Sequence, residues 1–345
     1  MIKTDIKMAK KVKITIAADT SNYTTSTAAA DENGNIIAQA RRLLKVKEGE
    51  RGLRQSDALF QHIVNMPEMM SQLMKQVRED AAARGVEYEI CAVAASTRPR
   101  PVEGSYMPVF LAGKGAAQNI AAALDIPFYE FSHQEGHIAA VCGADDPDRE
   151  FLSFHLSGGT GEILRVRDCM PLAIVGGIRD LSFGQLLDRV GVAAGLQFPA
   201  GAELDRIACA HKKDVCIKFS SRGKLMIEDA LLKPVHIDGS YADISGIETQ
   251  ALKAVKNGAP LDRLAPELFY HISEALYRMV SAAADSEHLD TVVFAGGVSA
   301  SSFIRQELEK RLPEHGINVF FGERELSSDN ACGIGILGMR AFLNS

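Results

Sequence analysis

Hydrophobic and polar positions follow two spacings along the chain, one typical of strands and the other of helices. The segment Val12–Ala17 alternates as a half-buried strand does, and it runs into the polar cluster Asp19–Thr25. The pair Asn33-Gly34 then predicts a tight hairpin turn, because these residues readily adopt the positive φ angles that such a turn requires. From Asp57 to Arg84, apolar residues recur every three or four positions, which predicts an amphipathic helix.

Strands and helices continue to alternate, and the chain then repeats its own opening. Further strands are expected at residues 90–95, 127–131 and 291–294, and further helices at residues 115–124 and 303–312. The strand Phe151–Leu156, a small polar turn at residues 157–161 and the return strand Glu162–Val166 are similar to the first strand, turn and strand. We therefore predict two related α/β halves that close on a cleft. They span residues 11–145 and 146–345, and the last helix packs back near the cleft.

Residues 41–54 form a basic segment, with six basic side chains against two acidic ones and a local charge of +4. The basic residues are Arg41, Arg42, Lys45, Lys47, Arg51 and Arg54. This segment is predicted to be a mobile loop, which serves either as a solvated surface or as a contact for phosphate groups. Loop or linker points are also expected at Gly176-Gly177 and at the acidic stretch Ala144–Asp148.

The composition is that of a globular protein. Of 345 residues, 46% are hydrophobic and 24% are charged, which excludes a disordered chain, a collagen or a coiled coil. No apolar run approaches the roughly 20 residues of a membrane span, and Met1–Asp5 lacks the apolar segment of a signal peptide, so we expect a cytoplasmic protein without membrane contact. Because the net charge is −6, a polyanionic partner would need a local basic patch. The six cysteines form no Cys-x-x-Cys pair and are expected to be reduced thiols.

The candidate chemistry centres on the segment His133–His137, which follows a predicted strand and opens a helix. Histidines at positions i and i+4 lie on one helix face, the spacing that puts two imidazoles on one metal ion. A third ligand is required, and Asp329 is the best-placed carboxylate; the alternative is a purely structural histidine pair. Glu135 lies roughly 200° around the helix from His133, which disfavours a protease base and favours a role in orienting the loop.

Two glycine-rich turns follow strands, at Ser157–Gly161 and Ala295–Ser299. Their backbone N–H groups have no Cβ in the way and let a phosphate approach closely, although glycines can also serve only for close packing. Together the two turns favour a nucleotide cleft. Asp188 and Gly201 are candidates for contact with ribose or adenine, the alternative being a capped surface helix in which Asp188 pairs with Arg189 or a neighbour.

In their order and spacing these motifs resemble the tRNA threonylcarbamoyladenosine transferase family, historically mislabelled O-sialoglycoprotein endopeptidases. The resemblance runs over nearly the whole chain. The motifs that carry it are Asp19-Thr20-Ser21, His133–His137, Ser157-Gly158-Gly159, Asp180–Arg189, Pro199-Ala200-Gly201, Ser245–Thr249, Ala295–Val298 and Ser328-Asp329-Asn330. It implies an α/β fold of two related halves of the actin, sugar-kinase and Hsp70 type, also called ribonuclease H-like, around a nucleotide cleft.

The resemblance also implies a set of site residues and a reaction. One divalent iron or zinc ion is expected on His133, His137 and Asp329. ATP or threonylcarbamoyl-AMP is expected to contact His155, Leu156, Ser157, Gly158, Gly159, Asp188, Gly201, Gly296, Gly297 and Ser301, and anion contacts are expected at Asp19, Thr20, Ser21, Arg98 and Arg100. The implied reaction is acyl transfer, not proteolysis: a threonylcarbamoyl group moves to the adenosine next to the anticodon of tRNA. The expected partners are tRNA and either other proteins of this pathway or a second copy of the chain.

The sequence also departs from the family pattern. The segment Thr97–Pro101 stands where the family has a Gly-Pro-Gly loop, Thr160 where it has a histidine, Gln185 where it has a glutamate and Ser301 where it has an asparagine. Metal and phosphate elements are retained, whereas elements on the acceptor and adenine sides differ, a pattern typical of a divergent paralogue. Two other functions therefore stay open: carbamoyl transfer to another acceptor, and a nucleotide-binding scaffold or regulator with weak ATPase activity.

Overall fold

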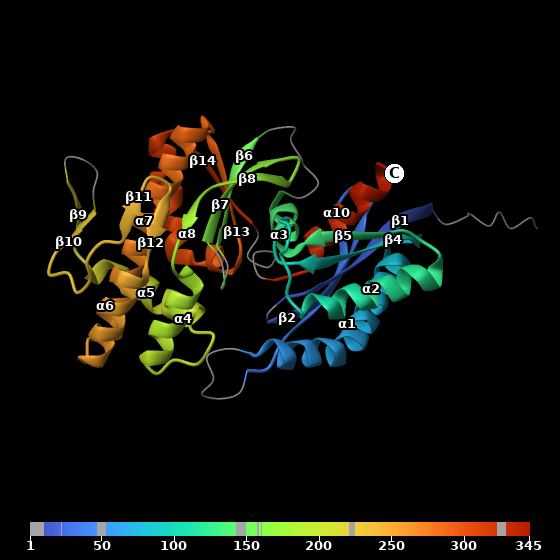
Figure 1. Cartoon of the computed structure of the whole chain (residues 1–345), viewed down its shortest axis with the longest axis horizontal. Coiled ribbons are helices and arrows are strands. Elements are labelled where there is room, and N and C mark those ends of the chain that lie inside the picture. The colour runs from blue at the N-terminus through green and yellow to red at the C-terminus, as the bar shows by residue number, and fades with distance from the viewer. Residues whose placement is uncertain are drawn as a thin grey trace, which may run out of the picture. The chain divides into compact units, whose positions relative to one another are not determined.

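The chain folds into two compact units, each with its own large mixed sheet (Figure 1). The computed structural model describes residues 10–345 except residues 22, 47–52, 143–149, 157–158, 160, 221–224 and 323–328. The first unit comprises residues 1–146 and 329–345, and the second comprises residues 147–328. Within the described part of the chain, no helix is both long and apolar enough to cross a lipid bilayer.

The first unit is built on a five-stranded sheet with the strand order β3-β2-β1-β4-β5. Its strands are β1 (Lys10–Thr20), β2 (Thr24–Asp31), β3 (Ile36–Leu43), β4 (Val86–Arg98) and β5 (Phe128–Ser132). The first three strands form an antiparallel meander, and β4 and β5 continue the sheet in parallel. The predicted hairpin at Asn33-Gly34 is confirmed: Gly34 has φ 78°, and the Asp31 carboxylate accepts the backbone N–H of Asn33 at 2.9 Å.

Helices cover both faces of this sheet because alternate residues of β1 point in opposite directions. The helices are α1 (Gln55–Arg84), α2 (Phe110–Leu124), α3 (His133–Cys142) and α10 (Cys332–Leu343). Ile14 and Ile16 pack with the buried stripe of α1, whereas Ala17 lies against α10. The predicted amphipathic helix is therefore confirmed as α1, and α2 begins earlier than expected, at Phe110.

The last helix belongs to the first unit, so the expected second half of residues 146–345 is wrong for residues 329–345. Helix α10 can pack closely against the first unit because it has glycines, which lack a side chain, on the face that contacts this unit. A Cβ added at Gly333 would lie 1.8 Å from the carbonyl oxygen of Gly136 in α3, and one added at Gly338 would lie 2.6 Å from the Cβ of Ala94 in β4. Only glycine permits backbones to approach this closely.

The second unit repeats the strand order of the first within a seven-stranded sheet, β11-β12-β8-β7-β6-β13-β14. Its strands are β6 (Phe151–Leu156), β7 (Gly161–Arg167), β8 (Met170–Ile178), β11 (His236–Asp238), β12 (Tyr241–Asp243), β13 (Thr291–Ala295) and β14 (Asn318–Phe321), and β9 (Ile217–Phe219) and β10 (Leu225–Ile227) form a separate hairpin. Strands β6, β7 and β8 form an antiparallel meander, and β13 and β14 continue it in parallel, as β4 and β5 do in the first unit. The predicted internal repeat is therefore confirmed.

Helices and short 3-10 turns complete the second unit. They are α4 (Phe183–Ala193), α5 (Gly201–Ala210), η1 (Lys212–Asp214), α6 (Ser245–Lys256), α7 (Leu261–Glu287), η2 (Gly297–Ala300), α8 (Ser302–Arg311) and η3 (Pro313–His315). Helix α7 is buried along most of its length and forms the centre of the core of this unit. Phe294 in β13 stacks on Phe154 of the neighbouring β6, with ring centroids 5.8 Å apart.

Two expectations about loops differ from the structure. Gly176-Gly177 lies inside β8 and is no linker: a Cβ at Gly176 would be 2.5 Å from the carbonyl oxygen of Ser240, so the glycine allows close strand contact. The basic segment is not a continuous loop, since Arg41 and Arg42 belong to β3 and Arg42 pairs with Glu68 of α1. Its residues 47–52 and the acidic stretch at 144–148 lie outside the described residues.

Candidate metal centre

Helix α3 begins directly at the end of β5, and its first turn is held by a capping box. The backbone N–H of Glu135 donates to Ser132 Oγ at 3.2 Å, and the backbone N–H of Ser132 donates to Glu135 Oε2 at 2.5 Å. This reciprocal pair satisfies two backbone donors that a helix start leaves unpaired. It gives Glu135 an orienting role at the start of α3, and the i and i+4 spacing directs His133 and His137 to the same side of that helix.

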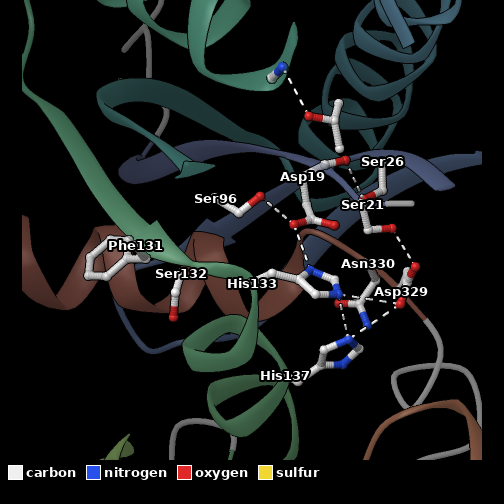
Figure 2. A network of polar contacts seen from close by, with 12 residues as sticks. Asp19, Ser21, Ser26, Ser96, Phe131, Ser132, His133, His137, Asp329 and Asn330 are labelled. Carbon is white, nitrogen blue, oxygen red and sulfur yellow. Dashed lines mark hydrogen bonds and ion pairs between the residues drawn. The ribbon is translucent and has the colours of Figure 1, made fainter. Parts of the chain in front are cut away.

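Three side chains converge from two distant parts of the sequence, as Figure 2 shows for His133, His137 and Asp329. The Nε2 atoms of the two histidines are 3.0 Å apart. Asp329 Oδ1 lies 3.5 Å from His133 Nε2 and 3.4 Å from His137 Nε2. The structure thus brings together the three residues expected to bind a metal, and all three belong to the first unit.

The donor set and its spacing fit a divalent metal ion. Bonds of about 2.0–2.1 Å in a tetrahedral site separate the ligand atoms by about 3.3–3.4 Å, and the observed distances of 3.0 to 3.5 Å lie around this value. Two imidazole nitrogens and one carboxylate oxygen suit both zinc and iron, and they leave at least one coordination position for a substrate or water.

Asp19 supports this arrangement from the end of β1. Its Oδ1 lies 2.9 Å from His133 Nδ1 and also accepts the hydroxyl of Ser96 in β4 (Figure 2). Because a carboxylate accepts, the neutral form of His133 carries its proton on Nδ1 and directs the Nε2 lone pair at the site. A carboxylate behind a metal-binding histidine is the usual way in which proteins orient such a ligand.

The carboxylates also set the charge of the site. Burial lowers the pKa of His133, but the carboxylates of Asp19 and Asp329 outweigh burial and hold it well above its ordinary value. Burial raises the pKa of Asp329, but hydrogen bonds with His133 and His137 outweigh it and hold the pKa well below its ordinary value. Positive charge is therefore favoured at the point where the three ligand atoms meet.

Two hydrogen bonds hold the segment that carries Asp329, one from Ser21 and one to the first turn of α10. The hydroxyl of Ser21, after β1, donates to Asp329 Oδ2 (Figure 2). The next residue, Asn330, accepts the backbone N–H of Cys332 at the start of α10, at 2.9 Å. Ser21 and the first turn of α10 together place the Asp329 carboxylate opposite α3.

The five residues expected to contact an anion fall into two groups, one around β1 and one at the end of β4. Asp19 and Ser21 bind the ligand residues, and Thr20 is fully buried, where its hydroxyl donates to the carbonyl oxygen of Val109 at 2.8 Å. The side-chain polar groups of these three residues are thus used inside the unit, and their assignment to anion binding stays a prediction. Arg98 lies at the end of β4, with its guanidinium 3.9 Å from Glu135, and Arg100 follows in the next turn.

In the second unit, the Asp188 side chain contacts the backbone of Gly201, and the predicted contact of both residues with ribose or adenine stays a prediction. Asp188 Oδ1 accepts the backbone N–H groups of Ala200 at 2.8 Å and of Gly201 at 3.3 Å, which caps the start of α5. Burial raises the pKa of Asp188, and the two hydrogen bonds oppose this shift. Of the two pairings that the alternative offered, Arg189 is not the partner, since it binds Glu248 at 2.9 Å, and Asp188 is bound by neighbouring backbone groups instead.

The carboxyl ends of β6 and β13 lie side by side, since His155 pairs with Ala295 in the parallel ladder. His155 and Leu156 are buried in β6, and a Cβ at Gly296 would lie 2.4 Å from the carbonyl oxygen of Leu156. Gly296 has φ 92°, and Gly297 opens η2. Of the other glycine turn, Gly159 is exposed, and Ser157, Gly158 and Thr160 lie outside the described residues.

Two positions that depart from the family pattern have defined local partners. The Ser301 hydroxyl binds Asp205, whose carboxylate also accepts the backbone N–H groups of Ser302 at 2.9 Å and Phe303 at 3.1 Å. Gln185 donates its backbone N–H to Ser182 Oγ at the start of α4, at 3.2 Å. Ser301 therefore helps to cap α8, so its hydroxyl is engaged within the unit.

Comparison with known proteins decides the family. The sequence profile of TsaD, tRNA N6-adenosine threonylcarbamoyltransferase, matches residues 38–336. The chain belongs to this family of transferases. A tRNA N6-adenosine threonylcarbamoyltransferase of Thermus thermophilus is 33% identical over 67% of this chain and 66% of its own length, slightly less than two thirds of that relative. The relative from Christiangramia forsetii is 27% identical over 96% of this chain and 94% of its own length.

Solved structures show that this member of the tRNA N6-adenosine threonylcarbamoyltransferase family has the predicted fold. HypF from T. kodakarensis matches with a TM-score of 0.58 at 14% identity, over 97% of this chain and 48% of that chain. Component A of the (R)-2-hydroxyglutaryl-CoA dehydratase from Acidaminococcus fermentans matches with a TM-score of 0.54 at 13% identity, over 96% of this chain and 99% of that chain. The actin, sugar-kinase and Hsp70 type of fold is therefore confirmed.

Three buried polar residues beside the candidate metal centre of this tRNA N6-adenosine threonylcarbamoyltransferase homologue were not predicted: Ser132, Ser96 and His62. Ser132 was detectable, since Ser-x-x-Glu before an apolar run is the sequence signature of a capping box. Ser96 lies near the end of β4 and donates its hydroxyl to Asp19, a contact that the sequence indicates only weakly because strand pairing is not visible in it. His62 occupies the apolar stripe of α1, where a histidine among methionines is the single indication that a polar contact is buried there.

Proposed function

We propose that this protein transfers the threonylcarbamoyl group from threonylcarbamoyl-AMP to the adenosine next to the anticodon of tRNA, with one iron or zinc ion on His133, His137 and Asp329. The observation that carries this proposal is the convergence of the three ligand atoms, 3.0 to 3.5 Å apart, in a chain that belongs to the tRNA N6-adenosine threonylcarbamoyltransferase family. The acceptor amine forms a bond to the carbamoyl carbon, AMP leaves, and the amine proton passes to solvent or to the leaving phosphate.

The residues of the first unit prepare this site. Asp19 holds a proton on His133 Nδ1 and so keeps Nε2 available as a ligand. Ser21 orients the Asp329 carboxylate, and the capping box holds the start of α3, the helix that carries both histidines. The bound ion supplies Lewis acidity toward the oxygens of the acyl donor.

We place the nucleotide part of the donor, or ATP, on the second unit, where β6 and β13 end side by side. Backbone N–H groups of glycine turns at the carboxyl ends of parallel strands are a common phosphate site. The same type of fold in full-length HypF has been solved in a phosphate- and nucleotide-bound form, which supports this placement. The proposed partners are tRNA and either other proteins of the same pathway or a second copy of this chain.

The test is a transfer assay with the full-length protein. Purified protein with its metal as isolated is mixed with labelled threonylcarbamoyl-AMP and unmodified tRNA, alone and with an extract that contains partner proteins. Product nucleosides are then identified by mass spectrometry. We expect threonylcarbamoyladenosine from the wild type, a loss of product in His137→Ala, and unchanged product in the control His236→Ala, whose side chain is 73% exposed.

The other outcomes discriminate among functions. If no modified adenosine forms even with the extract, while the protein binds metal and nucleotide, the tRNA proposal is refuted in favour of carbamoyl transfer to another acceptor. Slow ATP hydrolysis without any transfer product would instead favour a scaffold or regulator. If His133→Ala and His137→Ala leave the metal content per chain unchanged, the proposed metal site is wrong.

A further inference from the structure

A second histidine system lies behind the metal centre. His62 is fully buried in α1, and both of its ring nitrogens have partners within hydrogen-bond distance. Its Nε2 lies 2.6 Å from the carbonyl oxygen of Ser21, and its Nδ1 lies 2.8 Å from the hydroxyl of Thr25 in β2. A buried histidine with two well-formed contacts is fixed in position and in ring orientation.

The partners determine which nitrogen carries the proton. A carbonyl oxygen can only accept, so His62 donates from Nε2 to Ser21 and its Nδ1 accepts from the hydroxyl of Thr25. Thr25 in turn accepts from the side-chain amide of Asn65, one helical turn after His62, at 3.4 Å. The neutral imidazole completes this chain of donors, and burial lowers the pKa of His62, which favours the same neutral form.

The chain continues to the metal ligand. Ser21, whose carbonyl oxygen receives the His62 proton, donates its own hydroxyl to Asp329 Oδ2. Asp329 Oδ1 is then the carboxylate oxygen that faces His133 and His137. Ser21 therefore connects α1 to the metal-ligand candidate Asp329. Its backbone carbonyl binds His62 of α1, and its hydroxyl binds Asp329.

We propose that His62 is a positioning residue of the metal centre, which fixes Ser21 by donating from Nε2 to its backbone and thereby holds the Asp329 carboxylate in its ligating orientation. This inference rests on the proposed metal site, and it assigns to α1 a part in that site. It predicts that the hydrogen bond from the Nε2 position, rather than the bulk of the ring, determines metal affinity.

Two substitutions separate these contributions. Glutamine can place its amide N–H near the position of the histidine Nε2, whereas the shorter asparagine places its amide near Nδ1. His62→Gln therefore retains the donor to Ser21, and His62→Asn loses it while keeping a polar group beside Thr25. We expect the Zn²⁺ affinity of metal-free protein to fall about 10-fold or more in His62→Asn and to stay within about 3-fold of the wild type in His62→Gln.

The measurement is competition for Zn²⁺ between metal-free protein and a chromophoric chelator, with the urea midpoint of the metal-free variants measured in parallel. His271 supplies the matched control, because it is also buried in a long helix but belongs to the second unit. His271→Gln and His271→Asn are expected to leave Zn²⁺ affinity unchanged. Equal Zn²⁺ affinities for the two His62 variants, or a difference that merely follows their urea midpoints, would overturn the proposal.

A double-mutant cycle with Ser21→Ala tests whether His62 acts through Ser21, and Ser21→Ala alone tests the same path if His62→Asn folds poorly. Ser21→Ala removes the hydroxyl that binds Asp329 and leaves the contact between His62 and the Ser21 backbone possible. If His62 acts through Ser21, Ser21→Ala alone lowers Zn²⁺ affinity, and its loss combined with that of His62→Asn is smaller than the sum of the two single losses. Additive losses would overturn the proposal. If the wild type binds Zn²⁺ and His133→Ala does not, the proposed metal site is supported whatever the result for His62. If the wild type binds no Zn²⁺, both the proposed metal site and the proposed role of His62 are refuted.

Discussion

The contact between α10 and α3 gives the sharpest test of how the C-terminal segment reaches the metal centre. A Cβ at Gly333 would lie 1.8 Å from the carbonyl oxygen of Gly136 and 2.6 Å from the backbone nitrogen of Ala140. Both atoms belong to the backbone of α3, so no side chain can rotate away. Gly333→Ala therefore requires the two helices to separate locally by roughly 1.5 Å, in a core that is packed to crystal-like density.

The expected magnitude follows from two opposing effects. Replacing glycine by alanine in a helix stabilises it by up to about 1 kcal/mol, whereas overpacking of a core costs about 1–3 kcal/mol and occasionally more. We expect the free energy of unfolding to fall by about 1–2 kcal/mol in Gly333→Ala. Because Asp329 precedes α10 and the histidines lie on α3, the same separation should weaken Zn²⁺ binding.

Gly335→Ala is the matched control on the same helix. A Cβ there would lie 3.4 Å from the Cβ of Ala30 and 3.6 Å from that of Ala17, which is ordinary van der Waals contact. This variant should be neutral or more stable than the wild type by up to about 1 kcal/mol. Both variants are compared by urea denaturation followed by circular dichroism, with Zn²⁺ affinity measured in parallel. If Gly333→Ala is as stable as Gly335→Ala, or more so, the reasoning about the backbone contact is refuted.

Two further predictions concern titratable side chains. Asp19→Asn should lower Zn²⁺ affinity about 10- to 100-fold, because the neutral amide stabilises the ligating form of His133 less than the carboxylate does; unchanged affinity in chelator competition would contradict this role. Burial lowers the pKa of His271 from 6.5 to about 4, so between these values the unfolded chain binds a proton that the folded chain does not. The free energy of unfolding should therefore fall by up to about 3 kcal/mol as the pH falls from 6.5 to 4. His271→Gln should remove this contribution, so that its urea midpoint depends less on pH over this range. An identical pH dependence of the urea midpoint in the variant would show that His271 is not its source.

Much of the architecture could be predicted because each element is encoded locally. The Asn33-Gly34 turn, the apolar stripe of α1 and the recurrence of strand, polar turn and strand from Phe151 all depend on neighbouring residues. Predictions are wrong where a local pattern has more than one use. A glycine pair such as Gly176-Gly177 is typical of a linker, but here the glycines allow another chain segment to approach, which depends on residues that are distant in sequence.

In the candidate site, too, some features are encoded by neighbouring residues and others depend on residues that are distant in the sequence. The spacing of His133 and His137 determines by itself that both lie on one helix face, and the serine and glutamate around His133 determine where that helix begins. The family order of motifs indicated Asp329 as their partner. The roles of Asp19, Thr20 and Ser21 were not encoded in this way, since small polar residues after a strand serve anion binding and internal hydrogen bonding equally well.

The sequence alone determined two α/β units with a repeated strand pattern, the i and i+4 histidine pair and the family. Only the tertiary structure decided that residues 329–345 return to the first unit, that Asp19 and Ser21 support the ligands, and that His62 stands behind Ser21. The physical reason is the range of the interactions. Helix periodicity and turns are set within a few residues, whereas the contact of Gly333 with Gly136 and the hydrogen bond of Ser21 with Asp329 join segments that only the folded backbone brings together.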